Sequence, residues 1–104
     1  MSIFTKIINK EIPSTIIYED NKIIVIKDIN PKAKTHLLII PKKEIPTIND
    51  LENEDSTLIA DMFFVAKKLA KDLWIDEWYK LSFNVWEKWW QEVMHIHMHL
   101  LSEL

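Results

Sequence analysis

The chain of 104 residues contains no glycine, and this absence constrains its turns more than any other feature. Glycine adopts a left-handed backbone without steric penalty, and an average chain contains about 7% of it. Every tight turn must therefore be made by a residue that has a side chain. Five tryptophans, an unusually large number, stand at turns where glycine is expected and not at apolar positions of a predicted helix or strand: Trp74, Trp78, Trp86, Trp89 and Trp90.

Composition predicts one domain, residues 1–104, in a chain of ordinary apolar and charged content. The net charge of -3 and the absence of arginine argue against nucleic acid as a partner. The absence of cysteine excludes disulfides and thiolate metal sites. The N-terminal segment is too polar for a signal peptide, and no apolar run approaches the roughly 18 residues of a membrane helix. We therefore expect a cytoplasmic protein with no membrane partner.

The hydrophobic periodicity predicts an α+β fold in which three strands, one long helix and two more strands follow a short N-terminal helix. We expect Pro13 to end the short helix, residues 20–21 to form a two-residue turn, and the first three strands to form an antiparallel meander. The predicted helices are 3–12 and 54–73, and the predicted strands are 14–20, 22–29, 35–42, 79–85 and 92–101.

Three places have specific local requirements: the start of the long helix, its end, and the loop between the last two strands. Asn53 is a suitable N-cap for the long helix, because its side chain can accept a hydrogen bond from the first turn. Position 74 follows the last apolar residue of that helix, where a left-handed residue is usual. The loop of residues 86–90 between the last two strands also needs at least one residue with positive φ. The sequence has tryptophan at position 74 and at three positions of this loop.

Three histidines alternate with apolar residues near the C-terminus. Because successive side chains of a strand point to opposite faces, His95, His97 and His99 are expected to share one face. Each imidazole needs partners for two ring nitrogens, so three on one face indicate a functional site. The residues expected to enter the core are Met94, Ile96, Met98 and Leu100.

The spacing of the histidines is compatible with two chemistries. Histidines two residues apart on a strand can share a zinc or iron ion, with a third ligand from His36, Asp28 or Glu92. Alternatively, one neutral imidazole attacks phosphorus while its neighbours orient it and transfer protons. The spacing does not distinguish these two interpretations.

The sequence resembles the histidine triad (HIT) family of nucleotide hydrolases and transferases, and in particular its Hint branch. The resemblance extends over almost the whole chain and keeps the same order of motifs. The stretches that show it are "IFTKIINKEIPSTIIYED" (3–20), "KDINPKAKTHLLIIPKKEI" (27–45), "VAKKLAKDL" (65–73), "YKLSFNVWEKWWQEV" (79–93) and "HIHMHLL" (95–101).

The resemblance implies roles for four histidines. His97 matches the nucleophile that attacks the α-phosphate of a nucleoside monophosphate derivative and forms a nucleotidyl-histidine intermediate, which water then hydrolyses. His99 would contact the phosphate and the leaving group, and His95 would help to orient His97. His36 matches the fourth histidine of the family's site.

The same resemblance implies a substrate pocket. Asp28 matches the acidic residue that binds the ribose hydroxyls. The base pocket would be lined by Phe4, Ile7 and Ile29. The remaining candidates for substrate contact lie just before the tryptophan-rich loop, within it, or just after it: Asn84, Trp90, Gln91, Glu92 and Val93.

The family also implies a five-stranded antiparallel sheet with one long and one short helix, paired in a homodimer, and no metal or other cofactor. The expected activity is hydrolysis of purine nucleoside phosphoramidates or related nucleotidyl compounds. An alternative is a nucleotide-binding regulatory module with little turnover, which real tryptophans in the loop would favour.

All five tryptophans stand where the family typically has glycine. Independent substitutions would not be confined to glycine positions, nor would all five yield the same residue. We therefore hypothesise that a codon read as glycine in the source organism, UGA, has been translated as tryptophan. The abundance of isoleucine, lysine and asparagine is the bias of an AT-rich coding sequence, in which such reassignment is more plausible.

Overall fold

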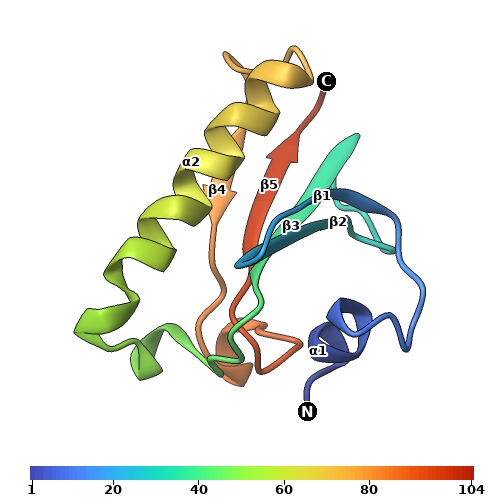
Figure 1. Cartoon of the computed structure of the whole chain (residues 1–104). Coiled ribbons are helices and arrows are strands. Elements are labelled where there is room, and N and C mark those ends of the chain that lie inside the picture. Colours follow the sequence, from blue (N-terminus) through green and yellow to red (C-terminus); the bar gives the residue numbers. More distant parts are fainter.

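The computed structural model describes residues 1–104 and consists of one five-stranded sheet with helices on both of its faces (Figure 1). Three short 3-10 helices lie in the connections: η1 (Ile48–Asp50), η2 (Asn53–Asp55) and η3 (Glu87–Trp89). The helices are α1 (Ile3–Ile8) and α2 (Ser56–Asp72), and the strands are β1 (Ile16–Glu19), β2 (Ile23–Lys27), β3 (Thr35–Pro41), β4 (Lys80–Ser82) and β5 (Met98–Ser102).

The strand order is β1-β2-β3-β5-β4, and every neighbouring pair is antiparallel. The predicted meander of the first three strands and the α+β class are therefore confirmed. β5 lies between β3 and β4 and so occupies an inner position of the sheet. No helix of the chain combines the length and apolar character needed to cross a bilayer.

Both faces of the sheet are apolar, because the inner strands alternate between two buried clusters. One cluster lies between the sheet and α2 and includes Val25, Ile39 and Met98. The other lies on the opposite face, where Ile26 and Leu38 contact Phe4 of α1 and its neighbours. Burial on both faces explains why β2 and β3 are nearly continuous runs of aliphatic residues.

The helix boundaries differ from the predicted ones. α1 ends at Ile8, well before Pro13, and Lys10 then adopts a left-handed backbone with φ of 64°. The long helix begins at Ser56, because residues 53–55 form η2 instead of its first turn. The prediction that Asn53 is the N-cap is therefore wrong. The side chain of Asp55 accepts a hydrogen bond from the Glu52 amide at 2.9 Å and stabilises this approach to the helix.

The predicted strands are also too long, and strand 79–85 is reduced to β4 (Lys80–Ser82). The connection between β1 and β2 has three residues, not two, because Asp20 Oδ1 accepts hydrogen bonds from the amides of Lys22 and Ile23. β5 begins only at Met98, so His95 and His97 precede the strand. The position of these two histidines therefore depends on contacts other than the sheet ladder.

Tryptophan provides three of the four left-handed residues in the chain. Trp74 has φ of 62°, and Trp90 has φ of 65° with ψ of 30°. Trp86 has φ of 76° and ψ of 155°, a region that is essentially restricted to glycine. The expected positive φ at position 74 and in the loop is confirmed. Trp78 and Trp89, in contrast, are not left-handed, so backbone geometry alone does not require glycine there.

Replacing Trp86 by glycine should stabilise the fold. Relief of the backbone strain, about 1–3 kcal/mol, exceeds the entropic penalty of glycine, about 0.5–1 kcal/mol. We expect the free energy of unfolding, measured by urea denaturation, to rise by about 1–2 kcal/mol. Trp89→Gly is the matched control from the same loop, and it should lower the stability by about 0.5–1 kcal/mol. Equal effects of the two substitutions would show that φ at position 86 is not strained.

Candidate active site

A pocket of about 500 Å³ lies on the face of the sheet opposite α2. Its apolar wall comes mainly from α1 and from the side chains of β2 and β3 on that face. Its polar wall comes from the residues after β2 and from the histidine segment. A pocket of this size, with an apolar part and a few convergent polar groups, is suited to a small-molecule ligand.

The structure places all but two of the predicted site residues on the wall of this pocket. The exceptions are His95, which is fully buried behind it, and Gln91. The predicted residues that line the pocket are Phe4, Ile7, Asp28, Ile29, His36, Asn84, Trp90, Glu92, Val93, His97 and His99.

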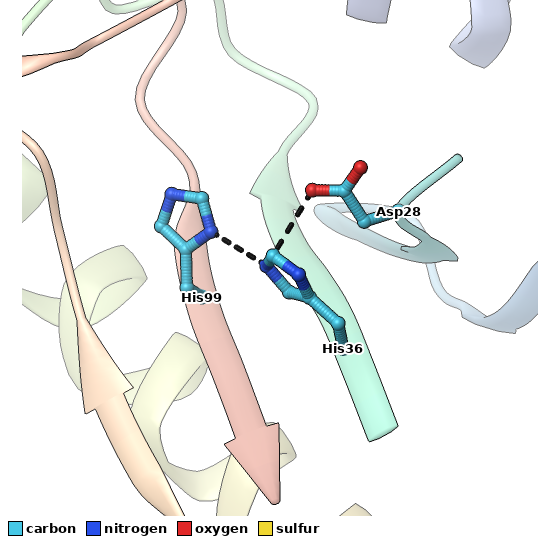
Figure 2. A group of neighbouring side chains, drawn as sticks. All are labelled: Asp28, His36 and His99. Atoms are coloured by element: carbon cyan, nitrogen blue, oxygen red, sulfur yellow. Dashed lines mark hydrogen bonds and ion pairs between the residues drawn. The ribbon is translucent and has the colours of Figure 1, made fainter. Parts of the chain in front are cut away.

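The antiparallel pairing of β3 and β5 brings His36 and His99 together. His36 lies opposite Leu101 and is therefore diagonal to His99 on the same face of the sheet. Figure 2 shows His36 between Asp28 and His99: its Nε2 is 2.9 Å from His99 Nδ1 and 3.4 Å from Asp28 Oδ2.

The partners of His36 and His99 assign the positions of their protons. The Lys32 amide donates to His36 Nδ1 at 3.1 Å, so the proton of a neutral His36 is on Nε2. His36 Nε2–H then donates to His99 Nδ1, which leaves the His99 proton on Nε2. This Nε2–H is buried and has no hydrogen-bond partner. A ligand oxygen or nitrogen in the pocket would provide the missing acceptor.

His97 has the opposite arrangement. Its Nδ1 is 2.8 Å from the main-chain oxygen of His95, which can only accept, so the His97 proton is on Nδ1. His97 Nε2 therefore has a free lone pair, and it makes no hydrogen bond within the protein. The rings of His97 and His99 lie edge to face with centroids 5.0 Å apart. One residue thus presents a nucleophilic nitrogen and the other a donor N–H to the same pocket.

His95 lies behind the pocket and is bonded at both nitrogens. Its Nε2 donates to the main-chain oxygen of Pro41 at 2.7 Å, and its Nδ1 is 2.6 Å from the Ser2 hydroxyl. It is the main chain of His95 that bonds His97, while the His95 ring contacts Phe4.

Comparison with known proteins identifies the family. Residues 1–103 match the family model described as "Scavenger mRNA decapping enzyme C-term binding". The chain is 46% identical to a purine nucleoside phosphoramidase of Escherichia coli (strain K12) over 97% of this chain and 86% of that protein. It is 42% identical to a 14 kDa zinc-binding protein of Zea mays, over 97% and 80% of the two chains.

Among solved structures, a HIT family hydrolase from Legionella pneumophila Philadelphia 1 superimposes with a TM-score of 0.97 and 50% identity. The match covers 100% of this chain and 94% of that one. The chain belongs to the HIT family. This confirms the resemblance predicted from the sequence and the five-stranded HIT fold, and it supports hydrolase activity in general.

The histidines of this HIT site are electrostatically neutral at pH 7. Burial lowers the pKa of His36, His95 and His97 below its usual value. For His99, burial and then the neighbouring His97 and His36 lower the pKa to about 4. Neutral imidazoles are required by the tautomers described above, so the pKa shifts and the hydrogen-bond geometry agree.

Asp28, His36 and His99 are the residues that could hold a metal ion. One ligand atom of each lies within 4.8 Å of the other two. The set differs from the predicted metal site, which paired histidines two residues apart. His36 Nε2 and His99 Nδ1 are also hydrogen bonded to each other, and a metal would have to replace this bond. The donor set fits a cation only after that rearrangement.

Gln91, which was predicted to bind substrate, lies outside the pocket wall. It is buried, and its Nε2 donates to the main-chain oxygens of Pro46 and Val93 at 2.6 and 3.0 Å. Its Oε1 accepts from the Trp86 amide at 2.9 Å. Gln91 therefore stabilises the tryptophan-rich loop from within and does not line the pocket.

The sequence analysis missed three residues that hold the pocket histidines or the helix beside them. Ser2 bonds the ring of His95, Lys32 bonds His36 through its amide, and Glu44 bonds the start of α1. Ser2 had a detectable signal, since serine before a helical pattern is a typical N-cap. Glu44 had none, because its partners are distant in sequence.

The lowered histidine pKa values predict acid destabilisation between pH 6.5 and about 4. In this range the unfolded chain binds protons at its histidines and the folded chain does not, so the free energy of unfolding falls as the pH falls. Thermal unfolding followed across this range would measure the slope. His99→Gln, which cannot be protonated, should make it shallower. An unchanged slope in His99→Gln would contradict the assignment of His99 as a contributor.

Proposed function

We propose that this HIT protein hydrolyses nucleoside monophosphate derivatives, of the purine phosphoramidate or nucleotidyl type, through a covalent intermediate on His97. The observation that supports this most directly is the opposite protonation of two adjacent rings. His97 has an unprotonated Nε2, and His99 has a buried Nε2–H without a partner. The similarity to a purine nucleoside phosphoramidase supports the substrate class.

The first step forms a bond between His97 Nε2 and the α-phosphorus and breaks the bond from phosphorus to the leaving nitrogen or oxygen. His99 Nε2–H donates a hydrogen bond to the leaving atom, and the proton that this atom takes comes from a water molecule. The positive charge that develops on His97 is stabilised by its Nδ1–H bond to the His95 carbonyl. In the second step the hydroxide left by that water attacks phosphorus, the bond from phosphorus to His97 Nε2 breaks, and His97 is released as a neutral imidazole.

We propose that the wall residues bind the nucleotide. Asp28 accepts hydrogen bonds from the ribose hydroxyls through its Oδ2, since its Oδ1 already accepts from the Asn30 amide at 2.9 Å. Phe4, Ile7 and Ile29 contact the base. Around the phosphate and leaving group, the contacts that we propose are those of Asn84, Trp90, Glu92 and Val93.

A second candidate function is nucleotide binding without turnover, which the position of Trp90 favours. The indole lines the pocket from a left-handed residue, and it covers space that a glycine would leave open for a phosphate. We retain the hypothesis that the five tryptophans represent glycines of the native protein. Sequencing of peptides from the native organism would test it, and tryptophan at 86, 89 and 90 would contradict it.

Hydrolysis of an adenosine phosphoramidate is the direct test. Two versions should be assayed, the chain as written and one with glycine at positions 74, 78, 86, 89 and 90. We expect turnover in the glycine version and a loss of at least about 10³-fold in kcat on His97→Ala. Mass spectrometry of an acid-free quench should locate the nucleotidyl group on His97. Nucleotide binding with no turnover in either version would favour the regulatory module.

The leaving group provides an internal control for His99. His99→Ala should lower the phosphoramidate rate by about 10²-fold, because the leaving amine must be protonated and loses the hydrogen bond that assists this. The loss should be much smaller for the p-nitrophenyl ester of the same nucleotide, because nitrophenolate leaves without a proton. Equal losses for the two substrates would contradict the assignment of His99 as the hydrogen-bond donor to the leaving group.

We also propose that the protein forms a homodimer, as its resemblance to the HIT family implies. α2 exposes two adjacent aromatic side chains, Phe63 (45% exposed) and Phe64 (66% exposed), which a second copy would cover. Sedimentation equilibrium should give a dimer, and Phe64→Lys should weaken it by at least about tenfold, since burial of one phenylalanine contributes about 1.5–3 kcal/mol. Glu11→Lys on another surface is the control. A monomeric parent chain would contradict the proposal.

A further inference from the structure

The two histidines that precede β5 are held by contacts outside the sheet. The ladder between β3 and β5 reaches only as far as Ile39 and Met98, so neither His95 nor His97 is fixed by strand pairing. Two hydrogen bonds to main-chain oxygens connect this segment to Pro41, the last residue of β3, and to Ile45, which follows it. The His95 ring donates to the oxygen of Pro41, and the Ile96 amide donates to the oxygen of Ile45 at 2.8 Å.

A further contact comes from the N-terminal segment. Because His95 Nε2 donates to a carbonyl, its Nδ1 has a lone pair, and the Ser2 hydroxyl must be the donor in their 2.6 Å bond. The Ser2 oxygen also accepts from the Thr5 amide at 3.0 Å, which is the N-cap bond of α1. One hydroxyl group thus connects the start of α1 to a fully buried imidazole.

Glu44 fixes Ser2 in this position. Its Oε1 accepts from the Ser2 amide at 2.6 Å and from the Thr5 hydroxyl at 2.7 Å. These bonds, with that of the Ser2 amide first, lower the pKa of Glu44 to about 2, so the carboxylate remains an acceptor at every pH at which the enzyme would be assayed. Phe4, between the two bonded residues, contacts the rings of both His95 and His97 edge-on.

We propose that Ser2, held by Glu44, is a positioning residue for the nucleophile: it keeps the His95 ring in one tautomer and one orientation, and the main-chain oxygen of His95 then directs His97 Nε2 into the pocket. The proposal rests on the function proposed above, in which His97 is the nucleophile. It assigns a role in the reaction to two residues, one at the N-terminal end of α1 and one after β3, neither of which lines the pocket.

The test must separate this role from helix capping. Ser2→Gly removes the hydroxyl but retains most of the capping preference, since glycine is nearly as good an N-cap as serine. Ser2→Thr retains the hydroxyl. Glu44→Gln keeps an acceptor oxygen for the two donors, and Glu44→Ala removes it. Ser56→Ala is the matched control, because it deletes a serine hydroxyl at the start of α2, away from the pocket.

In the glycine version of the chain, we expect Ser2→Gly and Glu44→Ala to lower kcat by about tenfold, the effect of a small misplacement of a reacting atom. KM should change by less than about threefold, because the pocket wall is intact. Ser2→Thr and Glu44→Gln should stay within about threefold of the parent, and Ser56→Ala should be unchanged. Wild-type kcat in Ser2→Gly, or an effect on KM alone, would overturn the proposal.

Nitrogen-15 NMR of the imidazole rings gives a readout that does not depend on activity. In the parent chain His95 Nδ1 should resonate as a hydrogen-bonded acceptor and His97 Nδ1 as a protonated nitrogen. In Ser2→Gly the His95 Nδ1 resonance should shift toward that of a free acceptor, and His97 should show a mixture of tautomers. Unchanged His97 resonances would overturn the proposal even if the parent chain proved inactive, whereas inactivity with the expected shifts would count only against the proposed function.

Discussion

The antiparallel pairing of β3 with β5 is the interaction on which the site and both cores depend. It places Leu37 and Leu100 opposite each other on the α2 face. On the other face it places His36 diagonal to His99. Because strand side chains alternate, a slip of one residue would bring the histidines into the helix-facing core and expose aliphatic side chains in the pocket. Hydrophobic burial thus specifies the register, and the register specifies which imidazoles meet.

The site uses hydrogen bonds of the main chain to make chemically similar rings act differently. The carbonyl of His95 imposes one tautomer on His97, and the Lys32 amide, acting through His36, imposes the other on His99. Burial lowers the pKa of all these imidazoles, so each tautomer persists at neutral pH. A buried N–H without a partner is unfavourable by about 1–3 kcal/mol. His99 Nε2–H is such a group, and a bound ligand that accepts from it would recover this free energy.

The sequence was sufficient for the parts of the fold that follow from alternation and helical periodicity. The continuous aliphatic runs predicted β2 and β3, and the alternation at residues 98–101 predicted which side chains of β5 are buried against α2. The pattern could not predict where β5 begins. His95 alternates with its neighbours as a strand residue does, yet it is buried by Pro41 and Ser2 and not by a paired strand.

The candidate site was predictable only where a local pattern or the family resemblance applied. The position of Ser2 before a helix indicated a cap, but its second bond, to a ring 93 residues later, depends on the tertiary fold. The contacts of Gln91 could not be predicted for a similar reason. An amide side chain can bind a phosphate or complete a loop, and only the positions of Pro46, Trp86 and Val93 decide between these roles.

The indole side chains of the tryptophan-rich loop do not determine its backbone conformation. Both main-chain groups of Trp86 are bonded to Gln91: the amide donates to Oε1, and the oxygen accepts from the Gln91 amide at 3.1 Å. The indoles contribute little in return, since all three are exposed and the one ring contact is that between Trp89 and Trp90. Gln91 therefore imposes on Trp86 a conformation that glycine alone adopts without strain. The loop has the geometry of a glycine turn, and no packing of the indoles accounts for the residues that occupy it.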